Sequence, residues 1–488
     1  MNLNFTRQLS VFAIAVALIG SCSYAQSFHP EPLIITGRPA DDLGFAGDNI
    51  ALMYNFALSP DGTWWVGEFE LDNALDAVML RGSGANQPEV VWAEHDPVPG
   101  FAGEEFRAIF EDRPNAIDDG GHVAGLARRN LAGVNRPLVY KFDGTELNVI
   151  ATEEFGVPAL PLTYGNQFHS PNVTSEGAAA FVAESLVGAI PGEDQVSLFE
   201  DGLFVGQRIG TTSYIGELLA DFNDGRFFTT NDFFLFDGNT IGLGASNEIV
   251  VFGEIGNDGT VVLQEDTTAI TLPNGITELF DRADQVFLTG NNDWYVLGDT
   301  NGAGGATEVA IRNGEVLVAE GDPSPDGFKY DQPIALSGDA NGNYVWIWET
   351  TNPDLDRDTV LVYNGDHLLL SEGDTIMLDY DNDGVDEPAV LEFLNLEARN
   401  VAVGGGYVYL MVEIDEPGTT IFFGNAFIRF PLFVLGDVNQ DSLVNLLDVQ
   451  PFVALLSNSE FQIEADTNQD GEVNLLDVAS FVDLLAGG

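Results

Sequence analysis

The chain is nearly devoid of cysteine and short of basic residues. Its 488 residues include one cysteine and only 17 Lys and Arg against 77 Asp and Glu. A single cysteine excludes a fold held together by internal disulfides. The formal net charge of −60 excludes proteins that bind nucleic acid or anionic lipid through a basic surface. The five histidines show neither H-E-x-x-H nor H-x-H spacing, so no local zinc site is predicted.

Long apolar runs are also missing, apart from one short run at the N-terminus. The start of the chain has one Arg, an apolar run at 11–19 and small residues up to Ala25, which is typical of a secretory signal peptide. The segment ending at Cys22 also resembles a bacterial lipobox, the alternative being a lipid anchor on that residue. We favour cleavage near Ala25. Residues 1–25 are therefore a predicted signal peptide, and the mature chain is predicted to be extracellular or at the cell surface.

Two stretches near the C-terminus are almost identical: DVNQDSLVNLLDV at 437–449 and DTNQDGEVNLLDV at 466–478. Oxygen-bearing side chains fall at positions 1, 3, 5, 9 and 12, and position 7 would contribute its backbone carbonyl, as in an EF-hand calcium loop. The predicted calcium ligands are Asp437, Asn439, Asp441, Leu443, Asn445 and Asp448 in the first loop, and Asp466, Asn468, Asp470, Glu472, Asn474 and Asp477 in the second. An apolar helical stripe follows each loop.

No helix precedes either loop, and position 12 is Asp rather than Glu. In these features residues 436–488 resemble a dockerin type I module, a pair of loop–helix calcium repeats. The resemblance implies that the calcium-bound module docks onto a cohesin-like protein domain and that loop positions 10 and 11 help to select the partner. These positions are Leu446, Leu447, Leu475 and Leu476. The alternative is that the four leucines belong to the core of the module.

Between residues 26 and 434, short β-rich runs alternate with turns rich in Gly, Asp, Asn and Pro. A polar turn followed by an aromatic or β-branched strand recurs, as in LSPDGTWWVG and VTSEGAAAFVA. The turns end at positions 62, 121, 177, 225, 259, 293, 342 and 405. Such repeats predict a mainly β fold with a seven- or eight-bladed β-propeller at 26–434, followed by a small α-helical dockerin-like module at 435–488. Two smaller β-domains are the alternative. The repeats also resemble secreted bacterial N-x-x-G-x-x-A-F tandem-repeat proteins.

A third acidic loop lies within the repeats. DYDNDGVDE, at 379–387, places Asp379, Asp381, Asp383 and Glu387 at positions 1, 3, 5 and 9. It resembles the calcium loops of integrin-type propeller blades, so we expect a calcium loop at a blade edge, the alternative being a solvated acidic turn. The tryptophans suit either a sugar-stacking platform or packing between blades, and we favour packing. These residues are Trp64, Trp65, Trp92, Trp294, Trp346 and Trp348.

These patterns predict an exported calcium-binding scaffold or binding protein. The propeller would present a surface to a polysaccharide or protein ligand, and the dockerin-like module would attach it to a cohesin-like partner. The alternative is an extracellular polysaccharide hydrolase or lyase carried on a dockerin. The chain has no G-x-S-x-G elbow and no phosphate-binding P-loop, so no catalytic residue is assigned and we expect no hydrolytic activity. Two carboxylates and a His at the central opening would favour the enzyme.

Overall fold

The computed structural model describes most of the chain beyond its N-terminus. The described residues are 30–72, 77–108, 115–153, 155–157, 160–184, 186–188, 196–199, 210–230, 233–241, 247–255, 257–302, 305–380, 385–393, 401–415, 422–432, 436–439, 444–458, 463–465, 467 and 473–487. The predicted signal peptide lies outside them. Contacts divide the chain into a unit spanning Pro30–Leu432 and a second unit that contains Phe433–Gly488. None of the helices in the described residues has the length and apolar character of a membrane span.

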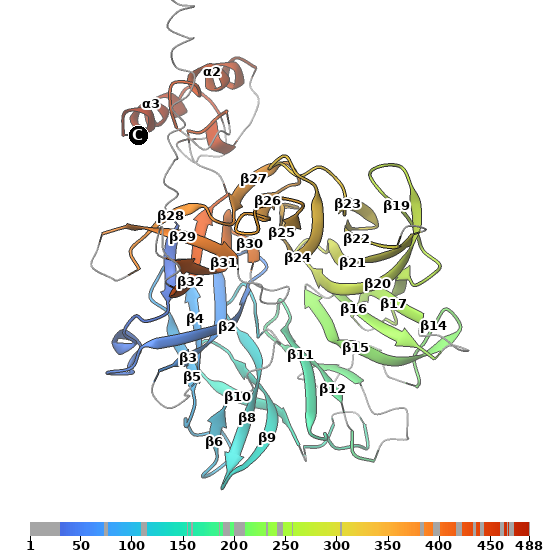
Figure 1. Cartoon of the computed structure of the whole chain (residues 1–488). Helices are drawn as coiled ribbons and strands as arrows, with labels where there is room; N and C mark the ends of the chain where they lie inside the picture. Colours follow the sequence, from blue (N-terminus) through green and yellow to red (C-terminus); the bar gives the residue numbers. More distant parts are fainter. Residues whose placement is uncertain are drawn as a thin grey trace, which may run out of the picture. The chain divides into compact units, whose positions relative to one another are not determined.

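The first unit consists of seven antiparallel sheets (Figure 1). Blade 1 contains β2 (Ile50–Leu58), β3 (Trp64–Leu71), β4 (Ala77–Ser83) and β5 (Glu89–Ala93); blade 2 contains β6 (Glu105–Arg107), β7 (Ala116–Ile117), β8 (Val123–Leu131), β9 (Val134–Phe142) and β10 (Leu147–Thr152); and blade 3 contains β11 (Gln167–Val173), β12 (Ala179–Glu184) and β13 (Val196–Phe199). Blade 4 contains β14 (Ser213–Tyr214), β15 (Glu217–Thr230), β16 (Phe233–Thr240), β17 (Asn247–Glu254) and β18 (Thr260–Gln264), and blade 5 contains β19 (Ala269–Thr271), β20 (Thr277–Leu288), β21 (Trp294–Gly302), β22 (Gly305–Arg312) and β23 (Glu315–Ala319). Blade 6 contains β24 (Tyr330–Gly338), β25 (Tyr344–Thr350), β26 (Thr359–Tyr363) and β27 (His367–Ser371), and blade 7 contains β28 (Thr375–Leu378), β29 (Glu387–Phe393), β30 (Val401–Gly404), β31 (Tyr407–Asp415), β32 (Phe422–Pro431) and β1 (Glu31–Ile35).

The seven sheets form a closed ring around one axis. Neighbouring inner strands contact each other in the order β2, β7, β11, β15 and β20, and β24 contacts β30, which in turn contacts β2. Blades 5 and 6 are joined by contacts of β24 with β21 and by a hydrogen bond from Gln285 Nε2 to the Leu336 carbonyl, 3.3 Å long. The arrangement confirms the predicted propeller, with seven blades.

The eight turn motifs of the sequence reduce to seven blades because two of them belong to blade 4. Position 225 falls within the bounds of β15, where the pairing with β16 breaks between Phe222 and Phe227, so no separate blade begins there. Gly259 lies in the turn between β17 and β18 of the same sheet. Pairing with β16 resumes at Phe227 and continues to Thr230, so the residues after the break belong to the same sheet.

The ring is closed by a strand from the N-terminal side of the unit. β1 pairs antiparallel with β32, with Ile35 opposite Ala426, and becomes the outermost strand of blade 7. Arg429 donates to Glu31 Oε2 at 2.7 Å and lies over the ring of Tyr407. Because residues almost 400 positions apart in sequence form one sheet, the first and last strands of the unit are held together.

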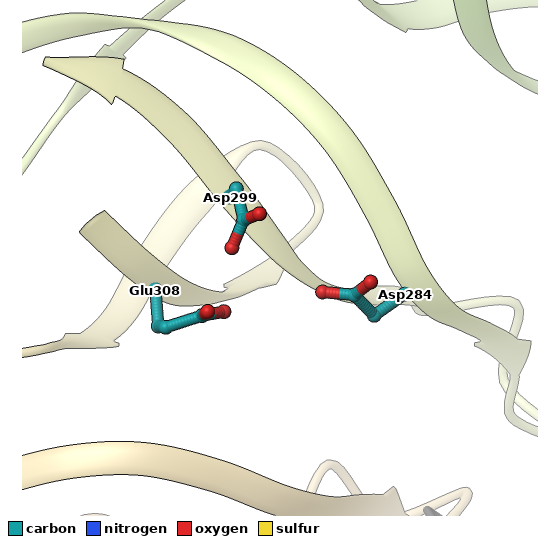
Figure 2. A group of neighbouring side chains, drawn as sticks. All are labelled: Asp284, Asp299 and Glu308. Atoms are coloured by element: carbon teal, nitrogen blue, oxygen red, sulfur yellow. The ribbon is translucent and has the colours of Figure 1, made fainter. Parts of the chain in front are cut away.

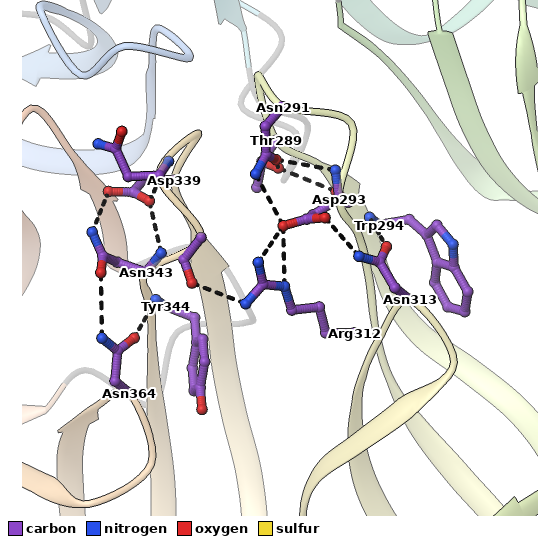
Figure 3. A network of polar contacts seen from close by, with 12 residues as sticks. Thr289, Asn291, Asp293, Trp294, Arg312, Asn313, Asp339, Asn343, Tyr344 and Asn364 are labelled. Carbon is purple, nitrogen blue, oxygen red and sulfur yellow. Dashed lines mark hydrogen bonds and ion pairs between the residues drawn. The ribbon is translucent and has the colours of Figure 1, made fainter.

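The turns that join β2 to β3, β7 to β8, β11 to β12, β20 to β21 and β24 to β25 share a similar backbone pattern. In blade 1, Ser59 N–H donates to the Trp64 carbonyl and Gly62 N–H to the Ser59 carbonyl, each at 2.9 Å. A corresponding pair forms in blades 2, 3, 5 and 6, where the first bond spans four positions instead of five, as from the Asp118 N–H to the His122 carbonyl. Figure 3 shows how Arg312 links two such turns: it donates to Asp293 Oδ2 of blade 5 and, at 3.0 Å, to the Gly342 carbonyl of blade 6. Arg81 donates to the Gly121 carbonyl in the same way between blades 1 and 2.

Aromatic side chains fill the spaces between blades. Five of the six tryptophans are buried, namely Trp65, Trp92, Trp294, Trp346 and Trp348. Trp346 and Trp348 lie on one face of β25 and pack with Tyr295 and Tyr330 between blades 5 and 6. The packing interpretation of these five side chains is therefore confirmed. They do not form a sugar-stacking platform, which would need exposed rings.

The C-terminal unit contains α2 (Val449–Asn458), the short 3-10 helix η2 (Ile463–Ala465) and α3 (Asp477–Gly487). Its core is small. Phe452 of α2 and Phe481 of α3 stack with ring centroids 4.0 Å apart, and Val438 and Ala465 are buried beside them. Pro451 is tolerated because α2 begins at Val449, which places the proline in the first turn.

Candidate metal centres and docking surface

The first C-terminal loop folds around the carboxylate of Asp448. This residue is completely buried, and its two oxygens accept the N–H groups of Asn439 at 2.9 Å and Asn445 at 2.8 Å. Asn445 Oδ1 in turn accepts the N–H of Leu447 at 2.8 Å. The position-12 side chain therefore reaches back to positions 3 and 9. Asp437, at position 1, is also buried, with 5% of its surface exposed.

The second loop repeats this arrangement where it is described. Asp477 is completely buried and accepts the N–H of Asn474 at 2.8 Å, while Asn474 Oδ1 accepts the N–H of Leu476 at 2.8 Å. The remaining predicted ligands lie outside the described residues: Asp441, Leu443, Asp466, Asn468, Asp470 and Glu472. Two copies 29 positions apart thus share local hydrogen bonding as well as sequence.

The chemistry of this segment fits a hard cation. Residues 433–488 contain no Lys, Arg or His, yet the carboxylates of Asp437, Asp448 and Asp477 are buried. Buried carboxylates are costly unless they are paired or coordinate a metal. Each carboxylate oxygen has two lone pairs, so an oxygen that accepts one N–H can still serve as a ligand. Calcium is the cation that such flexible all-oxygen loops suit.

The four leucines at loop positions 10 and 11 are exposed. Leu446 and Leu447 are 81% and 67% exposed, and Leu475 and Leu476 are 80% and 69% exposed. The alternative that they form the core of the module is therefore wrong, because Phe452, Phe481 and their neighbours take that place. Further apolar side chains extend each leucine pair onto its helix: Val449 and Val453 on α2, and Val478 and Val482 on α3.

The turns of blades 1 and 2 bring acidic residues next to a histidine. Asp118 Oδ2 lies 2.6 Å from His122 Nδ1, and Asp119 Oδ1 accepts the N–H of Asp61 at 2.8 Å. Partial burial raises the pKa of Asp119, with the Asp61 carboxylate adding to the effect. Burial acts in the same direction on Asp61, but hydrogen bonds from Thr63 and Ser59 outweigh it and hold the pKa of Asp61 low. Both carboxylates serve these turns as hydrogen-bond acceptors.

A second acidic group lies on blade 5 and was not predicted from the sequence. Figure 2 shows the carboxyl groups of Asp284, Asp299 and Glu308 directed toward one another from β20, β21 and β22, with one oxygen of each within 4.8 Å of the others. Burial, followed by the proximity of Asp299 and Asp284, raises the pKa of Glu308 to about 8. Local spacing does not reveal this group, because strand pairing assembles it. The signal in the sequence would have been three acidic residues within the strands of one blade.

The predicted calcium loop at 379–387 is described only at its ends. It connects β28 to β29, in which Leu378 pairs with Glu387. Asp379 Oδ1 lies 4.0 Å from Arg38 Nη2. Asp381 and Asp383 lie outside the described residues. The loop spans a hairpin turn, as a calcium loop at a blade edge requires, and the calcium site itself stays a prediction.

Comparison with known proteins agrees with this division. Residues 435–482 match the family model of the dockerin type I domain. The chain is therefore a seven-bladed β-propeller followed by a dockerin type I domain. Dockerin type I domains as a family bind calcium and dock onto cohesin domains. A search among curated proteins finds no match to this chain.

Several solved structures are similar at low identity. One is a prolyl endopeptidase, with a TM-score of 0.38 and 12% identity, and the match covers 87% of this chain and 55% of that chain. Another is an oligogalacturonate lyase in complex with manganese, with a TM-score of 0.36, 13% identity and coverage of 63% of this chain and 75% of that chain. A third is prolyl oligopeptidase B from Galerina marginata, with a TM-score of 0.36, 12% identity and coverage of 81% of this chain and 48% of that chain. The chain spans about half the length of the two prolyl peptidases. With TM-scores below 0.5, these likenesses support no conclusion about activity.

Proposed function

We propose that this protein is an exported, calcium-dependent scaffold or binding protein. Its dockerin domain attaches it to a cohesin-like domain, and its propeller presents a surface to a polysaccharide or protein ligand. In the proposed arrangement residues 1–25 are removed on export, residues 26–434 form the propeller and residues 435–488 form the docking module. A lipid anchor on Cys22 is the alternative for the N-terminus.

Calcium is proposed to organise the docking module. The ligands proposed on spacing are Asp437, Asn439, Asp441, Leu443, Asn445 and Asp448, and Asp466, Asn468, Asp470, Glu472, Asn474 and Asp477. The burial of three of these carboxylates in a segment without basic residues supports the assignment. A further calcium ion is proposed at the loop of Asp379, Asp381, Asp383 and Glu387.

The observation that carries the docking proposal is the exposure of the two leucine pairs. A small calcium module with a core of its own would gain nothing in stability from exposing Leu446 and Leu475 at about 80%. Clustered exposed apolar side chains with charged neighbours are typical of protein interfaces. The two copies present equivalent surfaces. We therefore expect a partner that is recognised through an apolar contact patch rather than through hydrogen bonds from hydroxyl groups.

Replacing one leucine of each pair by a charged residue is expected to abolish docking. The variant is Leu446→Asp with Leu475→Asp in the full chain. Burial of an unpaired carboxylate against an apolar partner costs several kcal/mol, so the affinity for a cohesin domain should fall by at least about 100-fold. Calorimetry against a panel of cohesin domains in calcium measures this effect. The matched control is Val134→Asp, since Val134 is 57% exposed on the propeller. Binding by none of the panel, or unchanged binding by the leucine variant, would contradict the proposal.

The enzyme alternative is favoured by one observation, the contact of Asp61 with Asp119 in the turn that also carries His122. Paired carboxylates whose pKa values move in opposite directions are typical of acid–base catalysis. Against this function, the turns converge near the axis: a Cβ placed on Gly290 of blade 5 would lie 3.1 Å from Pro60 of blade 1. Blades 1 and 5 are not neighbours in the ring, so the opening is narrow where these two turns meet. The carboxylates are also engaged in turn hydrogen bonds.

We therefore expect no polysaccharide catabolic activity from purified residues 26–488 in calcium. Incubation with acidic and neutral polysaccharides, followed by chromatography of released oligosaccharides, should show no products above a boiled control. Asp119→Asn is the informative variant, because the amide side chain keeps the shape of the carboxylate, and its oxygen can still accept the N–H of Asp61. If the unmodified protein releases products and the Asp119→Asn variant, at equal thermal stability, does not, the hydrolase or lyase function is established instead.

A further inference from the structure

The acidic group on blade 5 is assembled by strand pairing that places like charges together. Asp299 of β21 lies directly opposite Glu308 of β22, and directly opposite like charges destabilise a sheet. Asp284 comes from a bulge in β20, where the pairing with β21 shifts between Ala283 and Gln285. Bulges redirect side chains, and this one brings a third carboxylate to the same place (Figure 2).

Two oxygens of this group are buried without a hydrogen-bond partner among the described residues. They are Asp299 Oδ1 and Glu308 Oε2. Asp299 is only 4% exposed, so water reaches its carboxylate poorly. A buried carboxylate oxygen without a partner costs free energy, which either a bound cation or a proton shared between Asp299 and Glu308 would offset.

The charges do not balance within the chain. Arg282 Nε lies 2.7 Å from Asp299 Oδ2 and 3.4 Å from Asp284 Oδ1, so one positive charge faces three carboxylates. Glu308 forms no ion pair with any residue that the structure describes. When all three carboxyl groups are ionised, two negative charges remain, which is the charge that one divalent cation neutralises.

We propose that Asp284, Asp299 and Glu308 bind a divalent cation of the calcium class, separate from the dockerin loops. Calcium–oxygen distances of about 2.3–2.6 Å allow two ligand oxygens of one ion to lie up to about 5 Å apart, which accommodates the observed 4.8 Å limit. The Asp284 side chain is 42% exposed, so water completes the coordination from that side. The ion cross-links β20, β21 and β22 beside the contact of blade 5 with blade 6.

Counting bound calcium in full-length variants tests the site. The parent for the test carries Asp448→Ala and Asp477→Ala, which weaken the dockerin loops. Adding Asp299→Asn and Glu308→Gln keeps shape while removing two charges. Equilibrium dialysis should then find one calcium ion fewer per chain. Glu349→Gln in the same parent is the matched control, since Glu349 is a partly buried carboxylate on β25 of the next blade, and it should leave the count unchanged.

Thermal unfolding separates a metal site from a proton shared by the carboxylates. In chelator the amide variant should be at least as stable as its parent, because repulsion is removed; in calcium the parent should gain stability that the variant does not. Equal calcium counts for parent and variant would overturn the proposal. If the variant fails to fold, crystals of the unmodified chain grown with calcium decide: density for an ion between Asp299 and Glu308 supports the site, and its absence overturns it.

Discussion

Chelation of calcium from the full chain is expected to unfold the dockerin domain while the propeller stays folded. Among the described residues of the C-terminal unit, the core has four buried apolar side chains, Val438, Phe452, Ala465 and Phe481. Domains of this size seldom fold on their core alone, and the buried carboxylates of Asp448 and Asp477 repel each loop's other acidic ligands without a cation. Binding free energy in such modules is folding free energy.

Hydrogen exchange measured by mass spectrometry checks this result. At a free calcium concentration 100 times Kd, linkage stabilises the folded domain by about 2.7 kcal/mol per site, a factor of about 100 in the opening equilibrium. Peptides from α2 and α3 should lose at least that protection in chelator, whereas peptides from β2–β5 should not change. Magnesium in place of calcium is the control, because it demands a stricter geometry and should restore little protection. Retained protection of both helices in chelator would show that the module needs no ion.

Truncation of Trp348 is expected to be the most destabilising single change at the junction of blades 5 and 6. The side chain is completely buried and packs with Tyr330 and Trp346. Trp348→Ala should lower the free energy of unfolding by about 3–5 kcal/mol, because a large cavity replaces it. Trp348→Phe should lower it by less than half as much. Trp348 Nε1 is buried without a partner among the described residues, so losing this N–H removes a cost.

The neighbouring tryptophan provides the matched comparison. Trp346 Nε1 donates to Tyr330 Oη at 3.3 Å, so Trp346→Phe loses a buried hydrogen bond. Trp346→Phe should therefore cost more than Trp348→Phe in denaturant unfolding followed by circular dichroism. Leu355→Ala, at a residue 75% exposed, should change stability by less than about 0.5 kcal/mol. The reverse order of the two Phe variants would contradict the explanation from hydrogen bonding.

Hairpins were predictable because their determinants are adjacent in the chain. Asn313-Gly314 and Asn364-Gly365 adopt the positive φ values that tight hairpin turns require, and both lie between the strands expected from sequence. The blade number was harder to predict. The motif around position 225 has the composition of a turn followed by a strand, but it only interrupts the pairing of β15 with β16 between Phe222 and Phe227, and both halves of β15 pair with the same strand. Sheet pairing sums over many residues and outweighs a local turn preference.

The sequence by itself determined the chemistry that lies within a dozen residues: the spacing of oxygen ligands in two loops 29 positions apart, and the leucines at positions 10 and 11. Only the tertiary structure decided that those leucines are exposed, because packing of Phe452 against Phe481 already fills the core. It also decided that Asp284, Asp299 and Glu308 meet, because a bulge and the register of three strands bring them together. Ligand spacing is a property of the local chain, whereas register and burial depend on contacts between distant segments.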